Sequence, residues 1–463
     1  MKSWAWKEMK GTTLLHVKAR SSLAAVCERL HDAPKTAFSV AAGHAGRQVV
    51  QRVSRIKGVA SDPLLQGHFA QTAQRCGQYP RVLVAQDTTT ISFTRELPAK
   101  GTKGLRQRRV VRQYQAHSAL ALSPEGVPLG LLHLRLWRRA ADGSQSAAAK
   151  RKQRRSLPTS DKESHQWVQG LQDVEARLPP EQAVLVIQDR EADVFAFLAT
   201  PRRPNTHLLI RVAQARNVVV SATASETAPT GPVLTLAAAA AAFPKQGTRT
   251  VRVPAAKPGE DRPAELTLRS GALWLLPPTH GHPDDPREPQ RVWVVLAEEA
   301  DAPEGETPVC WVLLTTQPVE DLPAAEALLD HYALRWRIER LHYTLKSGLA
   351  IERLQHDEVR LPLVLARYYL VAWRIMWCLY LGRHEPDRPA TEVLEADELR
   401  VLSAANRQPV RTAADVVQAL ARLGGYVSYR KAKPPGLMRI WQGYRRLQEM
   451  LAGSRLQLEW KNC

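Results

Sequence analysis

The chain has 463 residues, with 65 Lys and Arg against 45 Asp and Glu, and a formal net charge of +20. Its hydrophobic content of 44% is ordinary for a folded protein and excludes wholesale disorder, and its length suffices for roughly two or three domains. The surplus of cations favours a polyanionic partner, namely DNA, RNA or an anionic membrane surface.

The sequence argues against the membrane alternative. It has no run of about 18 apolar residues, the length that a membrane-spanning helix needs. The stretch MKSWAWKEMKGTTLLHVKAR lacks the apolar region of a signal peptide. The 5 cysteines are odd in number, far apart and never in a CxxC pair. This pattern favours neither a disulfide framework nor a zinc site, and it predicts a reducing, cytoplasmic environment.

Periodicity and composition divide the chain into segments. Residues 1–75 read as short helical pieces with scattered cations. Strand-length apolar runs dominate 76–212 and return in 306–369, which predicts a core domain in two parts. The intervening segment 213–305 is rich in Pro, Ala, Gly and Thr and holds separate strand-like pieces, so we expect a β-rich insertion. Residues 370–463 are predominantly helical.

The core elements alternate between strands and helices, which predicts an α/β fold. Runs with the length and pattern of strands occur at 81–93, 115–123, 126–137, 183–189, 207–212 and 309–317. The stretch from Ser160 to Glu163 matches a capping box before a helix that Pro179 ends. A long helix is expected from about Asp321 to Ser347.

This long helix includes the basic stretch HYALRWRIERLHYTLKS. A wheel at about 100° per residue separates its side chains into two faces. One face holds Tyr332, Arg335, Glu339 and Lys346, and the opposite face holds Leu334, Ile338, Leu341 and Leu345. Taken alone, the polar face is better explained as a solvated surface with Arg335–Glu339 pairing than as a site.

Two further carboxylates change this interpretation. Asp87 lies inside the strand run VLVAQDTTTISF, and Asp189 ends the run AVLVIQD. A carboxylate there is costly to bury unless it is paired, protonated or bound to metal. Each Asp alone is better explained as a cap or a hydrogen-bonded strand end. Together with Glu339, however, they form the kind of oxygen set that binds Mg²⁺ or Mn²⁺, and two such ions about 4 Å apart promote attack on a phosphodiester.

The gaps of the helix face carry a family resemblance. The pattern Tyr332-(2)-Arg335-(3)-Glu339-(6)-Lys346 is similar to the YREK signature of cut-and-paste bacterial insertion-sequence transposases, the insertion-sequence-four family of the DDE superfamily. Neighbouring motifs of that family resemble DTTTISF at 87–93, DREADVFAFL at 189–198 and KESHQW at 162–167. The likeness runs from about residue 80 to 350, and more loosely through LARLGGY and IWQGYRRLQ in the C-terminal helices.

The resemblance implies an RNase H-like mixed-sheet core interrupted by the β-rich insertion. It implies that Asp87, Asp189 and Glu339 are the DDE triad and hold two Mg²⁺ ions, for which Mn²⁺ substitutes. The implied activity is cut-and-paste transposition: nicking of one strand, hairpin formation on the opposite strand, reopening, and joining of the 3′-OH to target DNA. The implied partners are the terminal inverted repeats, target DNA and a second copy of the chain, in a cytoplasmic, nucleoid-associated complex.

DNA-contacting residues also follow from the resemblance. Tyr332, Arg335 and Lys346 would hold the phosphates of the transposon end. Trp311, in VCWVLLTTQ, would stack on a flipped base, the alternative being an ordinary core aromatic. Arg211 and, more weakly, Arg190 would contact DNA, the alternative being ordinary surface arginines.

Residues 1–75 depart from the family. The family uses this region to bind transposon ends, but GRQVVQRVSR stands here where an aromatic-containing turn is expected, so the DNA sequence read remains open. The family places dimer contacts in the helices of 370–463. The basic runs TKGLRQRRVVR and KRKQRRS suit phosphate contacts or are solvated loops. Glu163 and Asp193 are assigned to helix capping and to a solvated helix.

Two other functions stay open at the level of sequence. One is a regulatory relative that binds transposon ends without catalysis. The other is a metal-dependent nuclease on the same core without strand transfer, which would have no need of Tyr332, Arg335 and Trp311 beside the triad.

Overall fold

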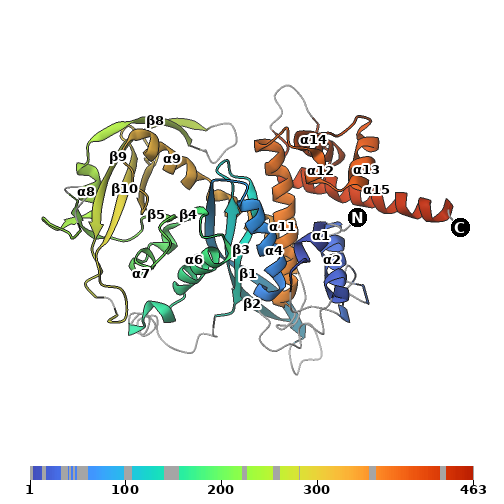
Figure 1. Cartoon of the computed structure of the whole chain (residues 1–463), viewed down its shortest axis with the longest axis horizontal. Helices are drawn as coiled ribbons and strands as arrows, with labels where there is room; N and C mark the ends of the chain where they lie inside the picture. Colours follow the sequence, from blue (N-terminus) through green and yellow to red (C-terminus); the bar gives the residue numbers. More distant parts are fainter. Residues whose placement is uncertain are drawn as a thin grey trace. The chain divides into compact units, whose positions relative to one another are not determined.

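The computed structural model, drawn in Figure 1, describes residues 4–12, 17–32, 40, 43–44, 47–48, 61–98, 107–139, 156–221, 227–253, 261–280, 282–353, 361–427 and 434–461. The chain forms two compact units. The first unit comprises Met1–Tyr79, Thr88–Ala140 and Arg337–Cys463, and the second comprises Pro80–Asp87 and Ala141–Trp336. The chain therefore crosses between the units beside two predicted site residues, directly after Asp87 and shortly before Glu339.

The second unit is built on a mixed sheet in the order β1-β4-β5-β11-β10-β9-β6-β7, with β8 paired to β9. Its strands are β1 (Arg81–Pro98, of which residues 81–87 belong here), β4 (Ala183–Gln188), β5 (Thr206–Arg211), β6 (Asn217–Val220), β7 (Leu234–Thr235), β8 (Lys245–Val253), β9 (Arg262–Leu275), β10 (Gln290–Glu299) and β11 (Cys310–Thr315). Strands β1, β4 and β5 are parallel, and β11 runs antiparallel to β5. The continuous apolar run of β4 suits a parallel strand that is buried on both faces.

The helices of the second unit are α6 (His165–Arg177), α7 (Phe195–Leu198), α8 (Leu236–Ala242) and α9 (Leu322–Ala333). The start predicted for α6 is wrong. Its N-cap is Ser164, without a side-chain cap, because Thr159–Asp161 forms a separate 3₁₀ turn. Asp285 holds that turn by accepting a hydrogen bond from the backbone N–H of Thr159 at 2.8 Å. The buried face of α6 is nevertheless the apolar face that the sequence predicts.

The segment between β5 and β11 contains β6 to β10 together with α8, which is formed by the six-alanine run. Strand β10 pairs with β11 along the whole length of β11, and Ala297 lies opposite Trp311. The added strands therefore extend the core sheet rather than form a sheet of their own.

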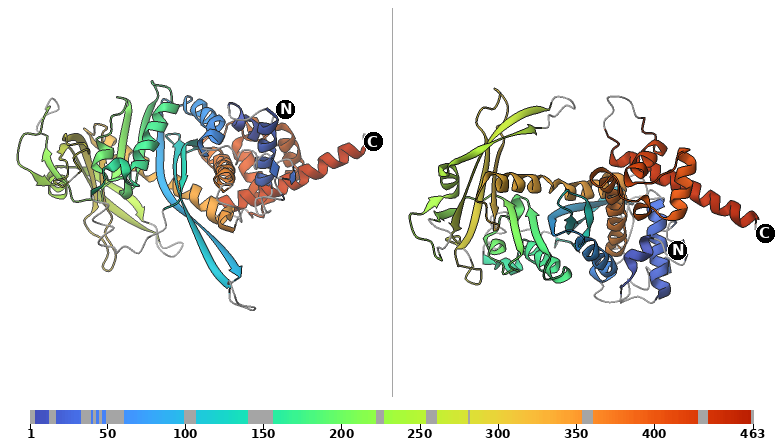
Figure 2. Two further views of the ribbon diagram at one scale, coloured as in Figure 1. Left: turned by 90° about the horizontal axis from the view of Figure 1, so that it is seen from below. Right: turned by 45° about the horizontal axis from the view of Figure 1, so that its top comes forward.

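The first unit combines the far part of β1 with β2 (Gln107–Leu122) and β3 (Pro128–Trp137), in the order β3-β2-β1. Figure 2 shows β1 and β2 side by side as a long two-stranded ribbon. The helices are α1 (Trp4–Met9), α2 (Val17–Asp32), α4 (Ser61–Cys76), α10 (Trp336–Tyr343, from Arg337 in this unit), α11 (Leu361–His384), α12 (Ala390–Val393), α13 (Ala396–Asn406), α14 (Ala413–Leu423) and α15 (Leu437–Lys461). Strands and helices thus occur as the predicted α/β fold requires. No described helix is long and apolar enough to cross a membrane.

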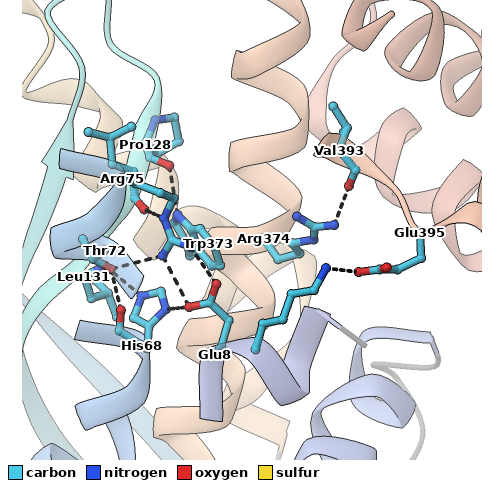
Figure 3. A network of polar contacts seen from close by, with 12 residues as sticks. Glu8, His68, Thr72, Arg75, Pro128, Leu131, Trp373, Arg374, Val393 and Glu395 are labelled. Carbon is cyan, nitrogen blue, oxygen red and sulfur yellow. Dashed lines mark hydrogen bonds and ion pairs between the residues drawn. The ribbon is translucent and has the colours of Figure 1, made fainter. Parts of the chain in front are cut away.

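A buried polar network joins α1, α4, β3 and α11 within the first unit (Figure 3). His68 Nδ1 lies 2.6 Å from the Glu8 carboxylate, and its Nε2 accepts the backbone N–H of Leu131 at 2.9 Å. His68 is therefore protonated on Nδ1 and donates to Glu8. Arg75 donates to the same carboxylate at 2.7 Å and stacks on Trp373, 4.4 Å from the ring centre. Burial by itself raises the pKa of Glu8, but the opposing effects of Arg75 and His68 are larger and lower it to about 2.

The helix predicted from Asp321 to Ser347 is not continuous, and this prediction is wrong. The structure has α9, then α10, and then a π-helical turn over Thr344–Gly348. Arg335 N–H bonds to the carbonyl of Tyr332 at 3.0 Å, which tightens the chain at the junction. Buried positions recur at helical spacing up to Tyr332 and resume at Ile338. On one continuous helix these two positions would lie about 120° apart, so the break lets each helix bury its own face.

Candidate active site

Asp87 lies within strand β1, and Asp189 directly follows β4, the neighbouring parallel strand of the second unit. In the register of the two strands, Ala85 of β1 pairs with Ile187 of β4. This is the last pair of the register; two residues beyond it, the chain reaches Asp87 on β1 and, just past the end of β4 at Gln188, Asp189. Both residues are half-buried.

The positions just before these acids reinforce the register. Gln188 Nε2 donates to Gln86 Oε1 at 3.0 Å, and both side chains are fully buried. Gly170 of α6 lies against them, because a Cβ atom there would come within 2.9 Å of Gln86 Oε1. Helix α6 thus approaches the sheet closely at the point where the two acidic strand ends begin.

Asp189 also caps a turn, as its alternative interpretation predicts. It is the N-cap of the 3₁₀ turn Arg190–Ala192, and its Oδ1 accepts the N–H of Glu191 at 2.9 Å. This bond orients the carboxylate and does not prevent it from binding a cation, because a carboxylate has lone pairs for several partners. Arg190 is exposed on the same turn.

Four of the predicted DNA-contacting residues lie together in the second unit. The rings of Trp311 and Tyr332 meet edge to face, 5.5 Å apart. Arg211 lies 5.8 Å from the Trp311 ring centre and donates to the Cys310 carbonyl at 3.3 Å, and Arg335 lies 5.9 Å from the Tyr332 ring centre. Trp311, Arg211 and Arg335 are half-buried, so each still reaches solvent.

Tyr332 is more buried than the wheel predicts, with 5% of its surface exposed. Burial is the main cause of its raised pKa, which the nearby guanidinium groups of Arg335 and Arg211 oppose. The charge of Asp189 raises it further, so this phenol lies within electrostatic reach of the acid. The hydroxyl therefore keeps its proton at neutral pH and remains a hydrogen-bond donor.

Glu339 and Lys346 belong to the first unit, and both are half-buried. Glu339 lies in the first turn of α10, and Lys346 lies in the π-helical turn that follows. One turn after Glu339, His342 is buried and its Nε2 lies 3.1 Å from the hydroxyl of Ser118 on β2. This contact anchors the inner face of α10 to the sheet of the same unit.

Ser118 lies within a group of buried histidines. His117 Nδ1 lies 2.8 Å from the hydroxyl of Thr88, the residue after Asp87, and the His117 ring meets His133 edge to face at 5.5 Å. Burial is the main cause that holds the pKa of His117 well below its usual value, and nearby His133, His342 and Arg135 lower it further. The imidazole of His117 is therefore neutral at physiological pH.

Asp193 is a residue whose role the sequence misses. Instead of lying on a solvated helix, it is 3% exposed. It forms an ion pair with Arg216 at 2.5 Å and accepts the backbone N–H groups of Ala213 and Gln214 at 2.8 and 2.7 Å. Its carboxylate thus ties the turn that follows Asp189 to the chain just after Arg211. The partners lie in a distant loop, so local periodicity gives no signal for them.

The donor chemistry at the acidic strand ends fits a hard divalent cation. The carboxylates of Asp87 and Asp189 supply the oxygen ligands that Mg²⁺ and Mn²⁺ prefer. Among the described residues, no three His, Cys, Asp or Glu side chains converge as a group that could hold a metal. Asp87 and Asp189 thus belong to the same unit, whereas Glu339 belongs to the other.

Other predicted contacts lie partly or wholly outside the described residues. The run KRKQRRS lies outside them except for its final serine, and of TKGLRQRRVVR only the part from Gln107 is described, within β2. Of the N-terminal stretch GRQVVQRVSR, only residues 47–48 are described. The sequence patterns do not single out Trp336, the residue after Arg335, whose side chain is 61% exposed. Its position next to a signature arginine is the signal that could have identified it.

Comparison with protein families matches two segments of the chain. The family model described as "Transposase DDE domain" matches residues 134–360, and the one described as "Transposase Tn5 dimerisation domain" matches residues 370–462. The first match includes Asp189 and Glu339 and begins after Asp87. A DDE domain implies the RNase H-like fold, which agrees with the mixed sheet and confirms the predicted fold class. The two matches together support a transposase of the DDE superfamily.

Proposed function

We propose that this transposase catalyses cut-and-paste transposition of an insertion sequence of the insertion-sequence-four family. In this reaction water cleaves one strand at the transposon end, and the freed 3′-OH attacks the opposite strand to form a hairpin. Water reopens the hairpin, and the 3′-OH then joins target DNA. In each step one P–O bond forms as another breaks: water gives a 5′-phosphate and a free 3′-OH, and an attacking 3′-OH gives a new phosphodiester and releases another 3′-OH.

The observation that carries this proposal is that the second unit contains two of the three acidic residues together with an aromatic pair and an arginine that are proposed to contact DNA. Asp87 and Asp189 each lie two residues beyond the last register pair of the adjacent parallel strands β1 and β4, and the charge of Asp189 acts on Tyr332. Trp311 and Arg211 pack beside Tyr332 through ring and guanidinium contacts. A simple nuclease would need the carboxylates but not the aromatic pair.

The acidic residues are proposed to bind the metal. DDE transposases generally depend on divalent metal ions, and we propose that Asp87, Asp189 and Glu339 hold two Mg²⁺ ions, for which Mn²⁺ substitutes. When bound, such ions activate water or a 3′-OH and stabilise the leaving oxygen. The carboxylates themselves supply the negative charge that concentrates the cations beside the DNA phosphate.

The basic and aromatic residues are proposed to hold the DNA. Arg335 and Lys346 pair with phosphates of the transposon end, and Arg335 can do so with two parallel hydrogen bonds. Tyr332 donates its protonated hydroxyl to a phosphate oxygen. Trp311 offers its ring to a base that leaves the duplex when the hairpin forms, and Arg211 and Arg190 contact the neighbouring backbone. The exposed ring of Trp336 is available as a second stacking surface.

The C-terminal helices are proposed to join two copies of the chain. The match of residues 370–462 to a dimerisation domain supports a dimer. We propose that the dimer brings two terminal inverted repeats together before target DNA is joined.

A cleavage assay tests the proposed function. The protein is incubated with Mg²⁺ and a duplex that carries the ends of its own element, and the products are separated on denaturing gels. We expect nicked strands, hairpins and joined products, all of which disappear without divalent metal or in Glu339→Gln. The matched control is Glu304→Gln, which changes an exposed loop glutamate and should leave every product unchanged.

Each alternative predicts a different result in the same assay. Nicks without hairpins or joined strands would identify a nuclease. Binding to the ends without any cleavage would identify a regulatory relative. Cleavage that persists in Glu339→Gln would refute the proposed triad.

A further inference from the structure

Two arginines of the first unit are held against one tyrosine. The guanidinium of Arg337, on α10, lies 4.0 Å from the ring centre of Tyr380 on α11, and that of Arg383 lies 5.6 Å from the same centre. Each is also held by a backbone carbonyl, because Arg337 donates to Gly126 at 3.1 Å and Arg383 donates to Pro435 at 2.6 Å. Stacking and hydrogen bonding thus fix two cations near one another.

A third arginine increases this concentration of charge. Arg340 is exposed one turn along α10 from Arg337, and its guanidinium lies 5.7 Å from the ring centre of Tyr343. Burial is the first cause of the lowered pKa of Arg383, while Tyr380 opposes it and the like charges of Arg337 and Arg340 add to it. The three arginines therefore lie within each other's electrostatic field. We call them, with Tyr380, the Tyr380 arginine cluster.

The cluster lacks an internal counter-charge. In the described part of the chain, no carboxylate lies within ion-pair distance of Arg337, Arg340 or Arg383. The nearby acid Glu385 is already engaged, since it pairs with Arg388 at 2.9 Å and accepts from Tyr79 at 2.6 Å. The pKa of His384 is lowered first by burial and then by Arg337 and Arg383, and the charge of Glu125 opposes this lowering.

Like charges held together without a counter-ion are unfavourable, and an anion that binds between them removes the repulsion. The arrangement also suits a phosphate in particular. A guanidinium is planar and presents paired N–H donors that match two oxygens of one phosphate. Arg340 and Arg383 are exposed, so their donors are accessible from solvent.

We propose that the Tyr380 arginine cluster binds phosphates of the DNA backbone. The inference rests on the proposed function, which supplies the DNA, and it adds phosphate contacts to those proposed for Tyr332, Arg335 and Lys346. Because the contacts are to phosphate, they are independent of DNA sequence and weaken with salt.

The test is equilibrium binding measured by fluorescence anisotropy across a salt series, without divalent metal so that no cleavage occurs. Two labelled duplexes are compared, one that carries the element's ends and one of unrelated sequence. For Arg340→Ala/Arg383→Ala we expect a salt dependence shallower by roughly two phosphate contacts and binding weaker by about tenfold or more at physiological salt. Weaker binding to both duplexes, or to one of them alone, supports phosphate binding by the cluster. Which duplex is affected tells whether the cluster contacts transposon ends, other DNA or both.

Controls separate loss of contact from loss of folding. Arg340 makes no side-chain hydrogen bond in the described structure, so Arg340→Glu should weaken binding further without lowering the melting temperature. Arg383→Lys keeps the charge and should retain the salt dependence. The matched control is Arg400→Ala, an exposed arginine of α13 beside Asp397, which should bind as the wild type does.

The inference fails if the double variant and Arg340→Glu keep the wild-type affinity and salt dependence on both duplexes. The proposed function is then unaffected, because the wild type still binds DNA. If the wild type itself binds neither duplex, both the proposed function and the cluster's role are refuted.

Discussion

Trp311 and Tyr332 support one another, with their rings edge to face at an interplanar angle of 69°. Trp311 comes from strand β11 and Tyr332 from the last turn of α9, so a sheet and a helix position the two rings jointly. Edge-to-face pairs of this kind contribute about 0.5–1.5 kcal/mol beyond their buried area. A variant at either position is therefore best compared with one that keeps an aromatic ring.

Trp311→Ala is expected to nick DNA ends normally and to form hairpins poorly. Stacking of a base on an aromatic ring contributes about 1–3 kcal/mol, so the hairpin yield should fall roughly 10- to 100-fold. Trp311→Phe keeps a ring beside Tyr332 and should recover most of the yield. Nicks and hairpins are counted separately on denaturing gels, and an unchanged hairpin yield in Trp311→Ala would reject the stacking role.

Asp193→Ala is expected to destabilise the second unit. The substitution leaves Arg216 buried without its counter-charge and removes the acceptor of two backbone N–H groups. Loss of one partner of a buried ion pair costs about 3–5 kcal/mol. Urea denaturation measures the loss, and Asp173→Ala, at a partly exposed ion pair with Arg177, is the control and should cost about 1 kcal/mol or less. Equal effects of the two variants would contradict the buried clamp.

His342→Leu is expected to slow nicking about tenfold while leaving DNA binding unchanged. The buried imidazole does not reach DNA, but its contact with Ser118 anchors the helix that carries Glu339. His342→Gln can still bond Ser118 and should restore the rate. Ser118→Ala should resemble His342→Leu, and the two together should cost little more than either alone, because they remove one interaction. Additive losses would show that the two side chains act independently.

The first unit is expected to lose stability in mild acid. The pKa of His117 is held well below its usual value by burial and by His133, His342 and Arg135, and burial and Arg75 lower the pKa of His68 despite Glu8. Below the ordinary histidine pKa of about 6.5 the unfolded chain takes up protons that the folded chain does not. As the pH falls below about 6.5, the free energy of unfolding should therefore decrease by up to about 1.4 kcal/mol per pH unit for each imidazole. Above about pH 6.5 it should not depend on these two groups.

Urea denaturation between about pH 5 and about pH 8 checks this dependence. His117→Gln removes one titrating group and keeps a possible partner for Thr88, so its stability should fall less steeply in acid. A variant that follows the wild-type curve at every pH would exclude His117 as a source of the acid sensitivity.

The core strands could be predicted from the sequence because burial on both faces makes them continuous apolar runs. Strands β4 and β5 differ from their predicted bounds by a single residue at their ends. The break before α10 is also present in the sequence, as the shift of phase between Tyr332 and Ile338. The helical wheel does not reveal this shift, because it counts Tyr332 as a polar residue. The ring of Tyr332 is buried against Trp311, which lies on a strand that the local pattern does not include.

The candidate site was predictable only in part for a similar reason. Asp87 and Asp189 stand out as acids in apolar runs, and the spacing from Tyr332 to Lys346 is local. The clamp of Asp193 and the contact of His342 with Ser118 depend on partners far away in the chain, which no local pattern specifies. The cluster around Tyr380 likewise joins α10 to the end of α11.

Strand β10 has a consequence for any shortened form of the chain. It pairs with β11 opposite Trp311, so it covers what would otherwise be an open edge of the core sheet. An uncovered edge offers unpaired N–H and C=O groups to a second chain and promotes aggregation. Deleting residues 217–299 is therefore expected to yield a protein that self-associates through β11, which places the Trp311 strand inside an intermolecular sheet before any chemistry can be measured.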